Sequence, residues 1–111
     1  MTEHQIDTPT KVLRHVVLFN FNETSTAPEI AAVEKAFAGL PDQIDEVYAF
    51  EWGVDVSVEN IARGYTHCFL VTFRSEQERD AYLIHPAHRQ FVAGAQPHLA
   101  QALVLDYWTH S

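Results

Sequence analysis

The run "YLIHPAHRQF", residues 82–91, holds three side chains that could do acid–base chemistry: Tyr82, His85 and His88. A free imidazole has a pKa of about 6.5, so a histidine can accept a proton near neutral pH. A tyrosine hydroxyl can hold that imidazole or donate to a carbonyl oxygen that gains negative charge. Together they suit proton abstraction beside a carbonyl, followed by aldol or Claisen closure or isomerisation. This chemistry needs no cofactor.

Two other interpretations of the histidines stay open. A metal site is one, because His85 and His88 with His15 or His67 could supply nitrogen ligands. The spacing matches no HExxH or Cys–His signature, however, so we expect no metal. No Gly-rich phosphate loop is present, so we expect no flavin or nicotinamide cofactor. A purely structural role is the second interpretation, and for His85, directly before Pro86, it means a cap or turn.

The elements around this run follow from the apolar periodicity. Residues 12–21, 44–56, 66–73 and 101–110 alternate as strands, with a bulge or bend expected at Gly53. Residues 26–40 repeat apolar side chains every three or four positions, and Thr26 with Glu29 forms a capping-box pattern. A second such pattern opens a helix from Ser75 to about Ile84, and Pro86 interrupts it before a further helical stretch to about Ala95.

The resulting order, β-α-β-β-α-β, predicts an α+β protein with a ferredoxin-like protomer. Its four-stranded antiparallel sheet carries both helices on one face. The other face would leave Val16, Leu18, Cys68 and Leu70 in water. An exposed apolar sheet of that size marks an interaction surface, so we expect a homodimer formed through the sheet faces, a dimeric α/β barrel.

The same alternation places candidate site residues. His15 and His67 each lie on a strand face otherwise built from Val and Phe, and the first and third strands are neighbours in this topology. A pocket between the helices and the sheet could therefore collect His15, His67, Tyr82 and His88. Its apolar walls would favour a hydrophobic aromatic or polyketide-like ligand. Asp106 on the last strand is expected to form a hydrogen bond or an ion pair, with Arg14 as one candidate partner.

Composition sets the class of protein. A chain of 111 residues is one domain, here residues 11–111 after a polar, flexible leader over residues 1–10. The formal net charge of −8 argues against nucleic acid and against anionic membrane surfaces. The single cysteine, Cys68, is expected to be a buried thiol in a reducing compartment, and no secretory or membrane-spanning pattern is visible. We expect a cytoplasmic protein.

The motifs "RHVVLFNF", "GYTHCFLVTF", "YLIHPAHRQF" and "LVLDYW" resemble the stress-responsive A/B barrel family, from about Leu13 to Trp108. That resemblance implies ferredoxin-like protomers packed into a dimeric barrel. The family includes plant stress-related proteins and a polyketide cyclase that makes olivetolic acid. In that cyclase a tyrosine and the second histidine of the similar motif are the catalytic pair, and they correspond to Tyr82 and His88.

The resemblance also implies pocket residues. The histidines of the first strand and of the "YTH" motif correspond to His15 and His67, and Phe37 stands where the cyclase has a tyrosine. With His85, these are the expected substrate-binding residues. Two functions remain in view. One is a barrel that binds a hydrophobic small molecule without catalysis, and the alternative is a cofactor-independent cyclase or isomerase with Tyr82 and His88 as its acid–base pair.

Overall fold

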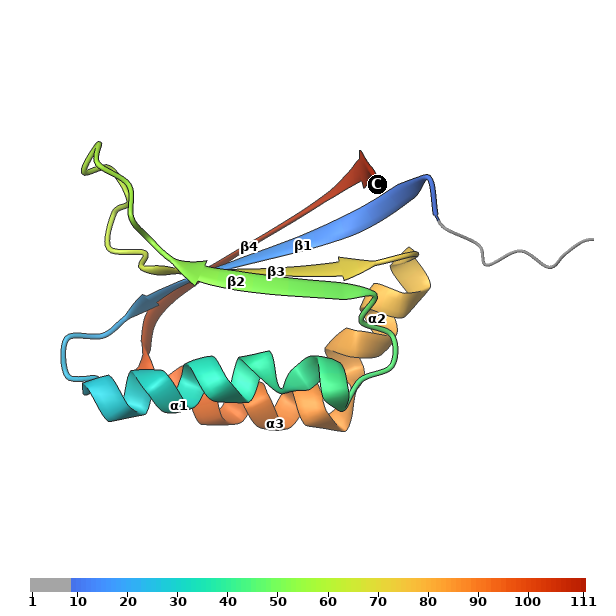
Figure 1. Cartoon of the computed structure of the whole chain (residues 1–111). Helices are drawn as coiled ribbons and strands as arrows, with labels where there is room; N and C mark the ends of the chain where they lie inside the picture. The colour runs from blue at the N-terminus through green and yellow to red at the C-terminus, as the bar shows by residue number, and fades with distance from the viewer. Residues whose placement is uncertain (1–8) are drawn as a thin grey trace, which may run out of the picture.

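The computed structural model describes residues 9–111 (Figure 1). Most of the expected leader, residues 1–8, lies outside the described residues. The elements are β1 (Lys11–Phe21), α1 (Ala27–Ala38), β2 (Ala49–Val54), β3 (His67–Phe73), α2 (Glu76–Ile84), α3 (Pro86–Ala95) and β4 (Leu99–His110). Short 3₁₀ turns, Leu40–Asp42 and Gln96–His98, follow α1 and α3.

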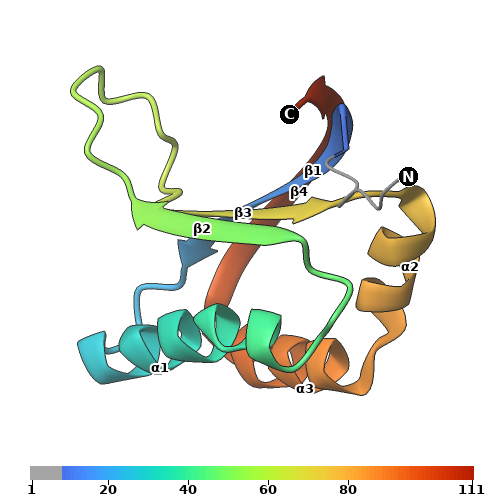
Figure 2. The same cartoon turned by 45° about the vertical axis from the view of Figure 1, so that its right-hand side comes forward.

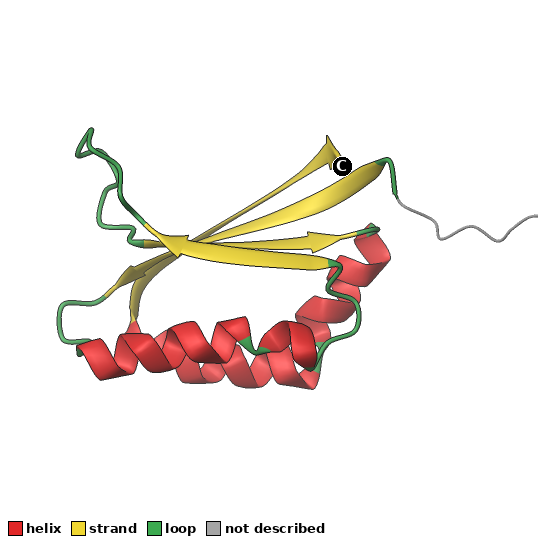
Figure 3. Ribbon diagram, viewed as in Figure 1, coloured by secondary structure: helices red, strands yellow, loops and turns green. Residues whose placement is uncertain are grey.

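The expected α+β, ferredoxin-like architecture is confirmed. The strands form one sheet in the order β2-β3-β1-β4, and each neighbouring pair is antiparallel. Figures 2 and 3 show the helices on one side of this sheet, with α1 and α3 side by side beneath it. Within the described residues, no helix has the length and apolar character needed to cross a membrane.

Local hydrogen bonds explain where the helices begin. The Thr26 hydroxyl accepts from the Glu29 amide, and the Glu29 carboxylate accepts from the Thr26 amide, which is the expected capping box. The Ser75 hydroxyl caps α2 in the same way, but the Glu78 carboxylate turns to Arg74 instead of completing the box. Each helix start therefore has its first free amides satisfied.

The alternation in β1 separates two sheet faces. Side chains on the helix-facing side are buried with α1 and α2 in one aromatic-rich core, which includes Leu13, Phe19, Phe37, Phe69, Phe73 and Tyr82. The opposite side is not covered by the chain. We call it the open sheet face, and it comprises Val16, Leu18, Cys68, Leu70, Leu103, Leu105 and Tyr107.

Two smaller expectations were wrong. Cys68 is exposed in the single chain, because it lies on the open sheet face instead of the core side. The expected bulge at Gly53 is absent, since β2 pairs with β3 without a register shift from Ala49 to Val54. Gly53 lies on the open sheet face, where a side chain would have no neighbour within 4 Å, so its small size is not required by local packing.

Candidate functional site

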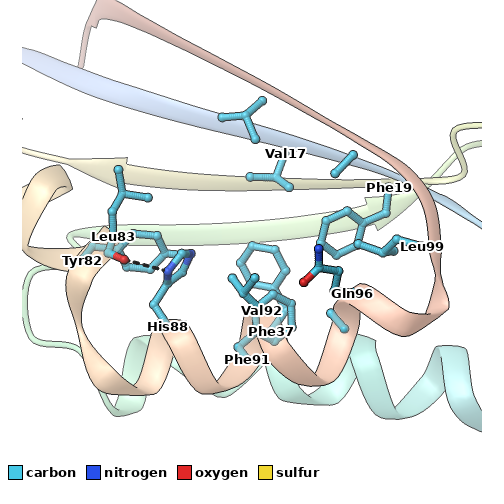
Figure 4. A pocket seen from close by; sticks show the side chains of 13 residues that line it. Val17, Phe19, Phe37, Tyr82, Leu83, His88, Phe91, Val92, Gln96 and Leu99 are labelled. Carbon is cyan, nitrogen blue, oxygen red and sulfur yellow. Dashed lines mark hydrogen bonds between the residues drawn. The ribbon is translucent and has the colours of Figure 1, made fainter.

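An apolar cavity of about 290 Å³ lies between the helix-facing side of the sheet and helices α2 and α3 (Figure 4). Its walls come from β1, β4, α1 and α3, and they include Val17, Phe19, Phe37, Phe91, Leu99 and Val104. Of the 13 residues that line it, three carry side chains with groups capable of hydrogen bonding: Tyr82, His88 and Gln96. An apolar cavity with a few polar groups is the usual form of a small-molecule site.

Tyr82 is the buried polar group of this cavity. Its side chain is 1% exposed, and burial raises the pKa of its phenol, so the hydroxyl stays protonated at neutral pH. Among the described residues, the Tyr82 hydroxyl is the one buried side-chain polar atom without a hydrogen-bond partner. Buried hydroxyls are nearly always bonded, so this one is a donor in need of an acceptor.

The break between α2 and α3 positions His88. The helix stops at Ile84, and Pro86 starts α3, where its missing amide proton costs nothing. This restart brings the His88 ring to Tyr82, with 4.6 Å between the ring centroids. The backbone oxygen of Leu83 lies 3.1 Å from His88 Nδ1. Because a carbonyl only accepts, Nδ1 carries the proton and Nε2 is the unprotonated nitrogen of the neutral ring.

The surroundings keep that ring neutral. Burial lowers the pKa of His88, the hydrogen bond to the Leu83 oxygen raises it, and the electrostatic interaction with the nearby His15 lowers it. The net pKa lies below the ordinary value of 6.5. At neutral pH, His88 is therefore an imidazole with one nitrogen free to accept a proton, next to a protonated phenol.

His15 lies behind this pair instead of lining the cavity. Its ring meets that of Tyr82 edge to face at 5.9 Å, and its Nδ1 lies 2.7 Å from Asp106 Oδ1. Arg79 Nη1 donates to the other Asp106 oxygen at 3.2 Å. A line of contacts thus runs from Arg79 at the surface through Asp106 and His15 to Tyr82.

Asp106 forms a hydrogen bond and an ion pair as expected, but its partners are His15 and Arg79 and not the candidate Arg14. Asp106 lies opposite His15 in the sheet and shares its helix-facing side. Arg14 is the next residue along β1, so its side chain points to the other face, where it donates to the Thr72 hydroxyl at 2.7 Å.

The structure does not bring His67 to the cavity. His67 lies opposite Phe19, at the far end of β3 from His15. Its Nε2 is 2.6 Å from Glu34 Oε2, and its Nδ1 is 2.8 Å from the Thr66 hydroxyl. Both ring nitrogens are engaged in these bonds, which tie α1 to β3.

His85 and Phe37, the other expected ligand-binding residues, differ in position. His85 is the N-cap of α3: its Nδ1 accepts from the Ala87 amide at 3.0 Å, and it does not line the cavity. This position agrees with its alternative interpretation as a cap. Phe37 does line the cavity, stacked on Phe69 with 4.2 Å between centroids, and it closes the inner wall with an apolar ring.

Gln96 was not anticipated from the sequence. It is the C-cap of α3, and its side chain lines the cavity with no hydrogen bond to any described residue. Within residues 9–111, no group of three or more His, Cys, Asp or Glu side chains is arranged to hold a metal ion.

These features define a ferredoxin-like α+β domain with a tyrosine–histidine pair in an apolar cavity. The chain belongs to the stress-responsive A/B barrel family, whose profile, described as "Stress responsive A/B Barrel Domain", matches residues 13–109. The expected family is thereby confirmed.

The chain is similar to three known proteins in particular. The stress-response A/B barrel domain-containing protein HS1 of Arabidopsis thaliana is 39% identical over 95 residues, covering 86% of this chain and 87% of HS1. Olivetolic acid cyclase of Cannabis sativa is 30% identical over 95 residues, which cover 86% of this chain and 94% of the cyclase. A dimeric ferredoxin-like protein of unknown function from Thermobifida fusca superposes with a TM-score of 0.76 at 26% identity. The superposition covers 96% of this chain and 98% of the Thermobifida fusca chain.

Proposed function

We propose that the protein binds a small hydrophobic molecule with a hydrogen-bond acceptor, such as a ketone oxygen, in the cavity beneath the sheet. The unpartnered Tyr82 hydroxyl carries this proposal, because a buried donor is costly to leave without an acceptor. The surrounding walls are aromatic and aliphatic, which suits an apolar ligand body. At about 290 Å³, the cavity has the volume of about ten water molecules, so the ligand is a single substituted ring or a short chain.

A second candidate function is catalysis by the same two side chains. His88 Nε2 would take a proton from the carbon next to the ketone, and the C–H electron pair would move toward the carbonyl oxygen. The Tyr82 hydroxyl would stabilise that oxyanion by donating to it. The enolate carbon would then attack a second carbonyl, whose oxygen takes up the proton from His88. Where a C=C bond is conjugated with the enolate, the γ-carbon would regain that proton instead, which shifts the double bond. The His88 tautomer and the similarity to a cyclase favour this candidate.

The assembly proposed for the protein is a homodimer through the open sheet face. Leu103, Leu105 and Tyr107 are between 44% and 60% exposed there, next to Val16 and Leu70 on neighbouring strands. A contiguous apolar sheet is rarely left in water. The Thermobifida fusca protein, with the same fold, is described as dimeric. In such a dimer each cavity would remain under its own protomer's helices.

Binding and catalysis can be tested without knowing the natural ligand. In heavy water, 4-phenylbutan-2-one is followed by proton NMR for line broadening, which reports binding, and for loss of its α-proton signals, which reports enolisation. We expect broadening with the wild-type protein and, for the catalytic candidate, faster exchange that His88→Gln abolishes. His98→Gln is the control, since His98 lies outside the cavity. Absence of binding up to millimolar protein would overturn the proposed function, and binding without exchange would leave only the first candidate.

A further inference from the structure

We propose that Gln96 is a second polar anchor of the cavity, so that the ligand is bifunctional, with a carbonyl at the Tyr82–His88 end and a hydroxyl or similar group at the Gln96 end. The inference deepens the proposed function and rests on it. Two of the three polar side chains that line the cavity, Tyr82 and His88, lie together. The third, Gln96, lies alone at the other end of α3.

The spacing follows from the helix. His88 and Gln96 are eight residues apart, which corresponds to about 12 Å along a helix axis. The α3 side chains that line the cavity between them, Phe91, Val92 and Ala95, are apolar. Figure 4 shows the His88 ring and the Gln96 amide on opposite sides of Val92 and Phe37. A ligand in contact with both therefore has polar groups at its two ends and an apolar body.

Gln96 also lies where a ligand would enter. A depression on the outer side of α3 shares Leu83, His88, Val92 and Gln96 with the cavity, so these four residues form its rim. Gln96 is exposed at this rim, and among residues 9–111 its amide has no hydrogen-bond partner. The amide offers both a donor and an acceptor. It can thus bond a ligand hydroxyl in either direction without first breaking a bond within the protein.

A matched pair of ketones tests this anchor. The first is 4-phenylbutan-2-one, and the second, 4-(4-hydroxyphenyl)butan-2-one, differs by one hydroxyl at the end opposite the carbonyl. Dissociation constants are measured by NMR titration for wild type, Gln96→Met and Gln90→Met. Methionine matches glutamine in length but forms no strong hydrogen bond. Gln90 is exposed on the same helix and does not line the cavity, so Gln90→Met controls for the change in composition.

We expect the hydroxylated ketone to bind wild type and Gln90→Met about five-fold more tightly, as one additional hydrogen bond provides. Gln96→Met should bind both ketones equally, with the affinity of wild type for the unsubstituted one. Equal affinities in wild type, or a preference that persists in Gln96→Met, would overturn the second anchor while leaving the proposed function intact. Failure of wild type to bind either ketone would overturn both.

Discussion

The rings of Tyr82 and His88 lie 4.6 Å apart between centroids, yet only the histidine has a hydrogen bond inside the protein. His88 is oriented by the backbone oxygen of Leu83, whereas the Tyr82 hydroxyl, a few residues earlier, has no partner. The pair is therefore positioned before any ligand arrives, and its phenol is a buried donor without a partner among residues 9–111. A preorganised donor of this kind strengthens the binding of an oxygen that gains charge.

Tyr82→Phe should separate binding from stability. The buried Tyr82 hydroxyl forms no hydrogen bond that stabilises the folded protein. Its removal should therefore leave the free energy of unfolding within about 1 kcal/mol of wild type or raise it. Ketone affinity should fall about ten-fold or more. Urea denaturation and NMR titration measure the two effects. A loss of stability above about 2 kcal/mol would mean that the hydroxyl has a structural partner after all.

The pH dependence should report the lowered pKa of His88. Burial disfavours the charged ring, so the folded protein binds fewer protons than the unfolded chain between the pKa of His88 and about 6.5. The contribution of His88 to stability is thus complete above pH 6.5 and is lost as the pH falls through the folded-state pKa. The NMR shift of the His88 ring proton should titrate below 6.5. A midpoint above 6.5 would rule out the neutral base.

Asp106→Ala should weaken the support behind Tyr82. The carboxylate bonds both His15 and Arg79, and hydrogen bonds to charged groups are worth more than neutral ones. We expect a loss of about 1–3 kcal/mol in the free energy of unfolding. Asp80→Ala is the control, because Asp80 also pairs with Arg79 but is 65% exposed, and it should cost less than about 0.5 kcal/mol. Equal losses in the two variants would contradict a structural role for the His15 bond.

Leu105→Asp should prevent dimerisation. Leu105 is 60% exposed in the centre of the open sheet face, and a carboxylate there would be buried without a partner in a sheet-to-sheet dimer. Ile84→Asp places the same charge at a similarly exposed aliphatic position, 64% exposed, on α2. Analytical ultracentrifugation should show a monomer for Leu105→Asp and a dimer for wild type and Ile84→Asp. A monomeric wild type would remove the basis of the proposed assembly.

The sequence correctly predicted which face of the sheet the histidines occupy, but it could not predict which residues of β1 and β3 lie opposite one another. Alternation correctly placed His15 and His67 on the helix-facing side of the sheet. It could not tell that His67 lies opposite Phe19, four residues and about 13 Å along β1 from His15. For that reason only Tyr82 and His88 of the four predicted groups line the cavity, while His15 lies behind Tyr82 and His67 lies away from it.

The break between α2 and α3 was predicted from the sequence, but the orientation of the residues around it was not. Pro86 indicated that the helix stops, and the restart at Pro86–Ala95 agrees with the prediction. The direction of the His88 ring depends on the angle between α2 and α3 and on the Leu83 oxygen, which no residue pattern specifies. His85 was predicted among the ligand-binding residues and, from its position directly before Pro86, alternatively as a cap or turn; the structure shows the N-cap. Gln96 gave no signal, since a glutamine at a helix end is ordinarily a solvated side chain.

The polar pair of the cavity and most of its apolar walls come from different parts of the chain. Tyr82, Leu83 and His88 belong to one short stretch whose mutual orientation depends on its own backbone, whereas the walls come from β1, β4, α1 and the rest of α3. Substitutions at wall positions such as Val17 or Val104 can therefore reshape the space around a ligand and leave the phenol and imidazole in place. In the proposed site, ligand preference and proton chemistry would therefore depend on different residues, and the walls could be changed without rebuilding the Tyr82–His88 pair.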